Sequence, residues 1–123
     1  SAKIFSEERS FMELASEVKF GDEILKKAYH ELESGKFEDK QLKDWLDRAR
    51  DDLKKNAFCG VQIPKRLIPK EYHTKYGPLT NLWKYNLPNA WRLLYSVGKE
   101  GIAVISIVVE WMNHKDYEKR FKY

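Results

Sequence analysis

The stretch Ile102–Trp111, IAVISIVVEW, is apolar at nearly every position and constrains the fold more than any other part of the chain. Its β-branched residues favour a pleated strand. A strand that is apolar on both faces must be covered on both sides, so this run predicts a central strand. Two shorter stretches of similar character precede it, Trp83–Leu87 and Trp91–Val97. Because turn residues separate the three stretches over gaps of only three to four residues, we expect an antiparallel meander.

Two amphipathic helices are predicted ahead of this sheet. Apolar residues recur at helical spacing over Asp22–Glu33 and again over Glu38–Lys55. Such stripes are typical of helix faces that rest on a core, and the short connection between them predicts an antiparallel helical hairpin. We therefore expect an α+β domain in which this hairpin covers one face of a small antiparallel sheet of three to four strands.

Five other segments are predicted from weaker patterns. Lys3–Ser6 is interpreted as a short edge strand, Glu7–Val18 as a short helix and Phe58–Ile63 as a strand. Between them and the meander, the stretch Pro64–Lys70 is predicted to be a loop, because its two prolines disfavour a helix or a central strand. After the central strand, the polar residues Asn113–Tyr117 are predicted to form a short tail that presents chemistry at the end of a rigid scaffold.

The 123 residues predict a single domain, with a helical part at 1–56 and the sheet and site at 57–123. A hydrophobic content of 42% excludes an intrinsically disordered chain. Cys59 is the only cysteine, so the chain has no intrachain disulfide and a cytoplasmic location is expected. We also expect no signal peptide and no membrane span, since the longest strongly apolar run, 102–109, is too short.

Charge is distributed unevenly along the chain. Residues 1–56 carry a net charge of −2, whereas residues 57–123 carry +6. This asymmetry favours an anionic ligand on the C-terminal half, although a solvated mixed surface explains it equally well. Within the proline-punctuated loop, Lys65, Arg66 and Lys70 are candidates for binding phosphate groups.

The motifs for nucleotide-dependent, zinc and serine-hydrolase chemistry are missing from the sequence, and its three histidines do not form a ligand pattern, so no metal site is expected. The candidates for chemistry are instead polar side chains of the C-terminal sheet and tail: Lys84, Arg92, His114, Lys115 and Tyr117.

Strand alternation places Arg92 and Leu94 on one face of their strand, and Lys84 can line the same surface from the neighbouring strand. Two plainer interpretations stay open. Arg92 can extend to solvent at a sheet edge or pair with Glu110, and Tyr117 can simply pack the tail.

Three segments together resemble the RelE/ParE superfamily of toxins from toxin–antitoxin pairs. The first is the lysine-bearing Leu82–Leu87, LWKYNL, and the second, after a tight turn, is Trp91–Tyr95, WRLLY. The third is the closing His114–Lys119, HKDYEK, in which a tyrosine follows a histidine at a spacing nearest to the HigB-like branch. The resemblance covers approximately residues 60–123. It implies a small antiparallel sheet packed on a helical hairpin, in agreement with the prediction above.

The resemblance also implies an activity and its partners. Ribonuclease members of the superfamily cleave mRNA, usually at the ribosome, without a metal or other cofactor, and a cognate antitoxin protein neutralises them. The 2′-hydroxyl of the RNA attacks the adjacent phosphate. This chemistry requires a base, cations for the charge that develops on the phosphate, and an acid for the leaving oxygen.

Carried onto this sequence, the resemblance implies that Arg92 holds the scissile phosphate and that Lys84 adds a second cation. His114 would act as acid or base, and Tyr117 would stack a base or orient the phosphate. Asn86 stands where the RelE branch has a second lysine, which leaves the general base unidentified. Lys115 and the three basic residues of the loop are candidates for contact with the RNA backbone.

Two alternatives share the fold. ParE-like members bind DNA gyrase and lack the catalytic residues, and a non-catalytic relative would serve as an RNA- or protein-binding module. The presence of arginine, histidine and tyrosine at the matching positions favours the nuclease.

Overall fold

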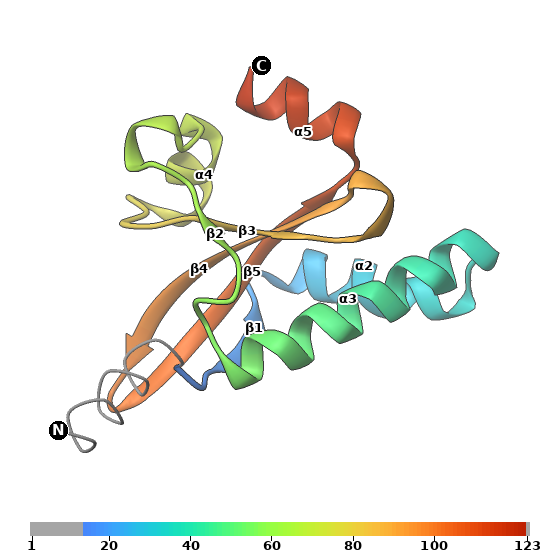
Figure 1. The fold of residues 1–123 in the computed structure, drawn as a ribbon, viewed down its shortest axis with the longest axis horizontal. Helices are drawn as coiled ribbons and strands as arrows, with labels where there is room; N and C mark the ends of the chain where they lie inside the picture. The colour runs from blue at the N-terminus through green and yellow to red at the C-terminus, as the bar shows by residue number, and fades with distance from the viewer. Residues whose placement is uncertain (1–13, 123) are drawn as a thin grey trace, which may run out of the picture.

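The computed structural model describes residues 14–122, which form an α+β domain with a central sheet (Figure 1). The helical hairpin and the three-stranded meander lie where the sequence predicts them. The elements in chain order are β1 (Glu17–Phe20), α2 (Glu23–Glu31), the 3₁₀ helix η1 (Leu32–Ser34), α3 (Phe37–Lys55), β2 (Val61–Gln62), η2 (Lys65–Leu67), α4 (Lys70–Tyr76), β3 (Trp83–Asn86), η3 (Pro88–Ala90), β4 (Arg92–Glu100), β5 (Ala103–Met112) and α5 (His114–Phe121).

The sheet is larger than predicted and mixed. Its five strands have the order β1-β5-β4-β3-β2. The meander β3-β4-β5 is antiparallel as expected, but β1 pairs parallel to β5, with Glu17 opposite Ile105. The expectation of a purely antiparallel sheet of three to four strands is therefore wrong. It failed because the pairing of β1 with β5 joins segments almost 90 residues apart, which no local pattern reveals.

The predictions for the N-terminal segments are partly untested and partly wrong. The strand predicted at Lys3–Ser6 and most of the helix predicted at Glu7–Val18 lie outside the described residues. The end of that helix is wrong, because Glu17 and Val18 belong to β1. Of the strand predicted at Phe58–Ile63, only the two residues of β2 pair with β3.

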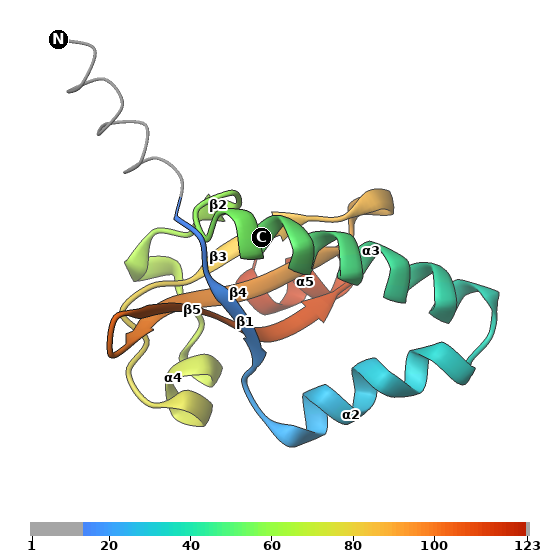
Figure 2. The same ribbon diagram turned by 90° about the horizontal axis from the view of Figure 1, so that it is seen from below.

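One face of the sheet is covered by α2 and α3, which run antiparallel to each other (Figure 2). The carboxylate of Asp22 caps α2 by accepting a hydrogen bond of 2.7 Å from the amide of Leu25. In α3, acidic residues occupy the first turn and lysines the last, as the helix dipole favours. The buried stripe of α3 packs against Leu93, Tyr95 and Val108 of the sheet; it consists of Leu42, Leu46, Ala49 and Leu53.

The opposite face is covered by α4 and α5, two helices that were not predicted (Figure 1). Tyr72 of α4 and Tyr117 of α5 are buried with Leu94, Val109 and Met112 of the sheet. The sheet is thus covered on both sides, as the apolar run of β5 requires.

No element was predicted for residues 71–76 of α4, the loop predicted at Pro64–Lys70 is correct only in part, and the tail predicted at Asn113–Tyr117 is wrong. The loop predicted at Pro64–Lys70 contains η2 and the first residue of α4, which begins directly after Pro69, a residue that fits this position because it has no amide hydrogen to leave unpaired. The predicted polar tail is helical because Asn113 caps it, accepting a hydrogen bond of 2.8 Å from the amide of Asp116.

A β-bulge in β5 alters which side chains face α4 and α5. Leu94 lies opposite Glu110 but Tyr95 lies opposite Val108, so Val109 is an extra residue in β5. Val109 packs in the core beneath α4 and α5, and the next residue, Glu110, contacts Tyr72 of α4 on the same side. The side chains of two consecutive residues therefore point to the same face of the sheet, which strict alternation does not allow.

Candidate functional site

Lys84 and Arg92 project from neighbouring strands on the face of the sheet covered by α5. In the antiparallel register of β3 and β4, Lys84 lies opposite Leu94 and Asn86 opposite Arg92. Leu94 packs in the core under α5, whereas Leu93 packs against α3. The predicted alternation along β4 is therefore confirmed.

Both of these cations lie close to the ring of Tyr117 of α5. The Nζ of Lys84 is 5.4 Å from the centroid of the Tyr117 ring, and the Cζ of Arg92 is 5.3 Å from it. Both distances are within the range of cation–π attraction. The ring also stacks on Phe121, with centroids 4.5 Å apart. Three residues from β3, β4 and α5 that the sequence analysis selected are thus brought together.

Burial limits what Tyr117 can do. Its side chain is only 3% exposed, so its ring faces are occupied by protein and not by solvent. Stacking on an RNA base would require α5 to move away. The ring instead packs in the core and contacts Lys84 and Arg92 from there, which agrees with the plainer interpretation that Tyr117 packs the C-terminal segment.

Arg92 is partly buried and has unused hydrogen-bonding capacity. Its Nη1 donates to the carbonyl of Trp91 at 3.2 Å. Its Nε is one of two buried side-chain polar atoms in residues 14–122 without a hydrogen-bond partner, and the other is the Nε of Arg50. A buried donor of this kind is uncommon in native proteins.

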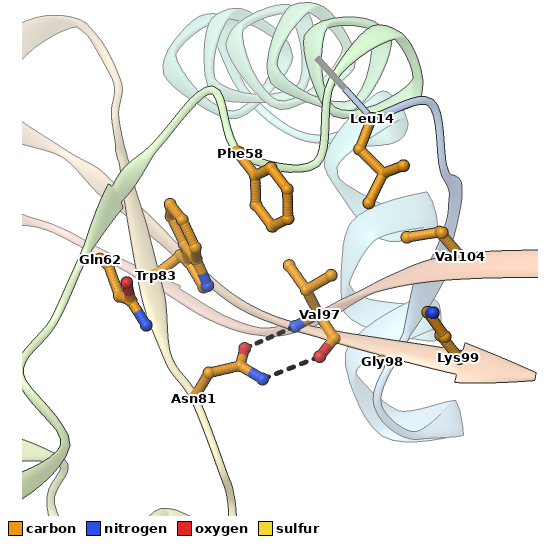
Figure 3. A pocket seen from close by; sticks show the side chains of 9 residues that line it. All are labelled: Leu14, Phe58, Gln62, Asn81, Trp83, Val97, Gly98, Lys99 and Val104. Atoms are coloured by element: carbon orange, nitrogen blue, oxygen red, sulfur yellow. Dashed lines mark hydrogen bonds between the residues drawn. The ribbon is translucent and has the colours of Figure 1, made fainter. Parts of the chain in front are cut away.

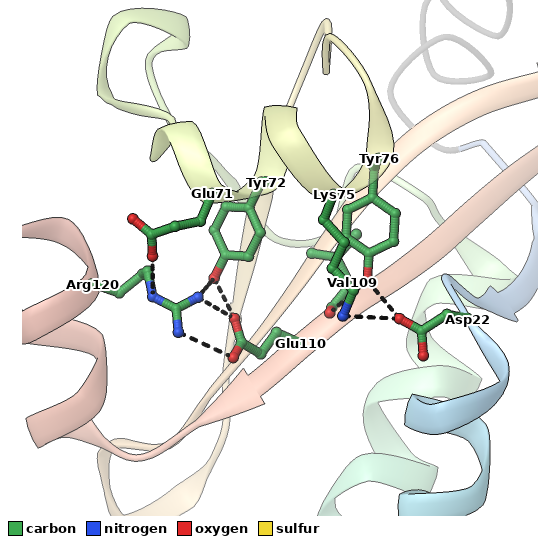
Figure 4. A network of polar contacts seen from close by, with 8 residues as sticks. All are labelled: Asp22, Glu71, Tyr72, Lys75, Tyr76, Val109, Glu110 and Arg120. Carbon is green, nitrogen blue, oxygen red and sulfur yellow. Dashed lines mark hydrogen bonds and ion pairs between the residues drawn. The ribbon is translucent and has the colours of Figure 1, made fainter.

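The interpretation that Arg92 pairs with Glu110 is wrong, because Glu110 is bound elsewhere. The guanidinium of Arg120 contacts the Glu110 carboxylate at 2.7 and 3.4 Å, and the Tyr72 hydroxyl donates to the same carboxylate at 2.6 Å (Figure 4). Arg120 also pairs with Glu71 at 2.8 Å. Burial, followed by the contact with Glu110, raises the pKa of Tyr72, so that its hydroxyl stays protonated and acts as a donor.

This cluster links three elements that are distant in sequence. Arg120 lies on α5, Glu110 on β5, and Glu71 and Tyr72 on α4. It therefore holds α5, and with it Tyr117, against the sheet. Arg120 is not among the site residues predicted from the sequence. Its position three residues after Tyr117, on the same side of a helix, was the one feature of the sequence that could have indicated it.

A second polar link in Figure 4 ties α4 to the start of α2. The Asp22 carboxylate contacts the Nζ of Lys75 at 2.9 Å and accepts from the Tyr76 hydroxyl at 3.2 Å. The hydrogen bond from the Leu25 amide, together with Lys75, keeps the pKa of Asp22 below its usual value. The carboxylate is thus a fixed structural anion.

His114 is the first residue of α5 and is exposed. Its Nε2 lies 2.6 Å from a carboxylate oxygen of Glu118, one turn further along the helix. The imidazole is exposed to solvent, and the contact with Glu118 occupies its Nε2. His114 shares α5 with Tyr117, and its side chain contacts Glu118 rather than Lys84 or Arg92.

The candidate RNA-binding residues lie on elements of the same half of the molecule. Lys65 and Arg66 lie in η2, Lys70 begins α4, and Lys115 follows His114 on α5; all four are exposed. The segment around η2 is anchored by Ile63 and Ile68, which share the core with Tyr72 and Tyr117. The exposed cations therefore border the sheet face that carries Lys84 and Arg92.

Residues 14–122 contain no group of three or more histidine, cysteine, aspartate or glutamate side chains arranged to hold a metal ion. Among their helices, none has both the length and the apolar character needed to cross a membrane.

Comparison with known proteins gave no relatives. No protein-family model matches the sequence, and neither a curated protein nor a solved structure matches it.

Proposed function

We propose that this chain is the toxin of a type II toxin–antitoxin pair, a RelE-like endoribonuclease that cleaves mRNA. The observation that carries the proposal is the convergence of Lys84 and Arg92 on the buried ring of Tyr117. These residues come from the three segments that resemble the RelE/ParE superfamily. The presence of a helical hairpin, α2–α3, on a sheet that contains the meander β3–β5 supports the proposal at the level of fold class.

The proposed reaction is a transesterification within the RNA. The 2′-oxygen attacks the adjacent phosphorus, the bond to the 5′-oxygen breaks, and the products carry a 2′,3′-cyclic phosphate and a 5′-hydroxyl. A base removes the proton of the 2′-hydroxyl, and an acid supplies a proton to the leaving 5′-oxygen. Negative charge increases on the phosphate oxygens in the transition state, so a fixed cation accelerates the reaction.

Arg92 suits the phosphate-binding role. Its guanidinium is held by the Trp91 carbonyl and by the Tyr117 ring, which limits its freedom before the substrate arrives. A planar guanidinium binds phosphate through two parallel hydrogen bonds, which gives a defined orientation. Lys84 supplies a second positive charge from the next strand.

His114 is the proposed acid or base, since an imidazole exchanges protons near neutral pH. Its contact with Glu118 orients the ring, as a carboxylate does for a catalytic histidine. Asn86, opposite Arg92 in the register, is exposed and cannot act as a base, so the second proton-transfer group remains to be assigned.

Binding of the RNA backbone is proposed for Lys65, Arg66, Lys70 and Lys115. Each is exposed and bears a flexible cationic side chain, which suits salt-dependent contact with phosphates rather than recognition of bases. The proposed partners are mRNA on the ribosome and a cognate antitoxin protein, in the cytoplasm.

The test compares two arginine variants on opposite faces. Arg92→Ala should abolish growth arrest after induced expression and lower the rate of mRNA cleavage on the order of 10²- to 10³-fold, by analogy with the loss of an oxyanion donor. His114→Gln should lower the rate less, about 10²-fold. Arg48→Ala, an exposed arginine of α3, is the matched control and should cleave normally.

Two results would contradict the nuclease. One is an Arg92→Ala variant that remains toxic; the other is cleavage that stops when a chelator is added. Growth arrest with intact mRNA and inhibited gyrase would support a ParE-like toxin instead. RNA binding with neither cleavage nor arrest would point to a non-catalytic relative.

A further inference from the structure

A pocket of about 410 Å³ lies at the β1 edge of the sheet, where β1 meets α2 and α3. Val18, Lys19 and Phe20 of β1 form one wall, residues of α2 as far as His30 form a second, and Arg50 of α3 completes the lining. Figure 2 shows how β1 leads into α2 while α3 runs alongside it. A volume of this size accepts a small organic molecule.

Arg50 defines the chemistry of this pocket. Its Cζ lies 5.2 Å from the centroid of the Phe20 ring and 5.0 Å from that of the Tyr29 ring, and its Nη1 donates to the Tyr29 hydroxyl at 3.0 Å. Its Nε is buried, whereas its Nη2 is not buried and has no hydrogen-bond partner among residues 14–122. The guanidinium is thus held in place by aromatic contacts while one of its nitrogens is free to donate.

The positive charge of Arg50 is only partly neutralised. Within residues 14–122 its one ion pair is with Asp47, at 3.9 Å. The same carboxylate contacts the Nζ of Lys43 at 3.1 Å and accepts a hydrogen bond from the Tyr29 hydroxyl. One carboxylate is therefore shared by two cations, and a net positive charge stays beside the pocket.

Two groups of α2 add to this charge. Lys26 and His30 lie four residues apart, and thus on the same side of the helix, and both are exposed and line the pocket. Neither side chain forms an ion pair or a hydrogen bond with residues 14–122. Two acids also line the pocket, but the Asp22 carboxylate is already bound by Lys75. Only Glu23 opposes the cations from within the described lining.

We propose that this pocket binds a small phosphomonoester, with its phosphate group against Arg50, Lys26 and His30. Such a phosphate group carries a charge of about −1.5 to −2 near neutral pH, so it matches several cationic groups better than a carboxylate does. Guanidinium and ammonium groups are the usual protein partners of phosphate. The half-buried Val18 and Phe20 supply apolar surface for the organic part of the ligand.

A second pocket, between β3 and the β4–β5 hairpin, has a different character (Figure 3). Its walls are mostly apolar and include Phe58 and Trp83, whose rings stack with centroids 5.3 Å apart. The amide side chain of Asn81 is engaged with the Val97 backbone through two hydrogen bonds of 2.8 Å. Lys99 is the one cation among the described residues of this lining. It therefore provides a matched control for the loss of a single charge.

The proposed phosphate pocket is separate from the candidate nuclease site. Phe20 packs against the core under α3, whereas Lys84 and Arg92 contact Tyr117 on the opposite face of the sheet. A small molecule in the pocket does not cover these two cations. The proposal is independent of the nuclease activity and can hold or fail separately from it.

The test titrates the full chain with three probes: phenyl phosphate, inorganic phosphate and benzoate. Calorimetry gives the affinities, and the ring signals of Phe20 and His30 in NMR spectra locate the site. We expect saturable binding of phenyl phosphate, at least tenfold weaker binding of benzoate, and weaker binding of inorganic phosphate because it has no apolar part. Absence of saturable phenyl phosphate binding, or equal affinity for either of the other probes, would overturn the proposal.

Variants assign the charges. Arg50→Met should weaken phenyl phosphate binding at least tenfold, and circular dichroism checks that this variant is folded. Lys26→Met, at an exposed position that leaves the core intact, should weaken binding about fivefold. Glu23→Gln should tighten binding, because it removes the opposing carboxylate. Lys99→Met, in the pocket of Figure 3, is the control and should bind normally. Equal affinity of Lys26→Met, Glu23→Gln and the wild type would overturn the proposal.

Discussion

On the face covered by α2 and α3, the ion pairs of Asp47 stay within one helix, whereas on the face covered by α4 and α5 the ion pairs of Arg120 join distant segments. Asp47 pairs with Lys43 and Arg50 within α3 itself, and the Tyr29 hydroxyl donates to Asp47 from the adjacent helix α2. On the other face, Arg120 connects Glu71 and Glu110. The first face is a local helical hairpin on a sheet. The second face depends on the complete fold, and it carries the candidate site.

This difference suggests that stability and function are separable by face. Substitutions in the core between α3 and the sheet should lower the free energy of unfolding without changing RNA binding at the candidate site. Substitutions that loosen the packing of α5 should weaken RNA binding and lower the free energy of unfolding only slightly. Leu46→Ala and Arg120→Met test this separation directly; Ile105→Asp and Ala90→Gly mark the largest and the smallest expected effects on stability.

Ile105→Asp should unfold the whole domain, because β5 is shared by both faces. Ile105 is 4% exposed and lies between β1 and β4. An unpaired buried carboxylate costs several kcal/mol, which is comparable to the total stability of a domain of this size. Circular dichroism should show loss of the folded signal. The control Ile102→Asp, three residues away and fully exposed, should melt like the wild type.

Leu46→Ala should destabilise the domain by about 2–5 kcal/mol and leave RNA binding unchanged below the melting temperature. Leu46 is 1% exposed in the core under α3, so its removal leaves a cavity far from Arg92. Chemical denaturation and an RNA-binding titration measure the two quantities. Ile24→Ala, at an 81% exposed position of α2, is the matched control. A change in RNA affinity would show that the two faces are coupled.

Arg120→Met should have the opposite effect: a small loss of stability and a clear loss of RNA binding. It removes the ion pairs to Glu71 and Glu110, and since these side chains are partly solvated the loss of stability should be only about 1 kcal/mol. Amide hydrogens of α5 should exchange faster, and RNA should bind several-fold more weakly because Tyr117 is held less firmly. Lys119→Met, the exposed neighbour, should change neither quantity. Unchanged exchange in α5 would mean that its apolar packing alone holds the helix.

Ala90→Gly should stabilise the protein slightly, by about 0.5–1 kcal/mol. Ala90 has φ +60° in the turn between β3 and β4, a conformation that is strained for any residue with a Cβ. Glycine relieves this strain but gains entropy in the unfolded chain, so the net effect is small. Thermal unfolding gives the measurement. Asn89→Gly should gain less, because asparagine tolerates its φ of +56°.

The sequence alone determined the elements whose signals are local. The stripe of α3, the three strands of the meander and the faces of Arg92 and Leu93 all follow from the spacing of side chains along one segment, and the structure has them. The proximity of Lys84 to Arg92 was predictable for the same reason, since a short turn sets the register of two adjacent strands.

Only the tertiary structure decided the rest. The parallel pairing of β1 with β5 and the packing of α5 through Tyr117 both join residues separated by long stretches of chain. The bulge at Val109 places Val109 and Glu110 on the same face, against strict alternation, and the packing of α5 on that face brings Arg120 to Glu110. The physical reason is that these contacts depend on which segments meet in space. The periodicity of one segment shows which of its faces is apolar but does not show which distant segment packs against that face.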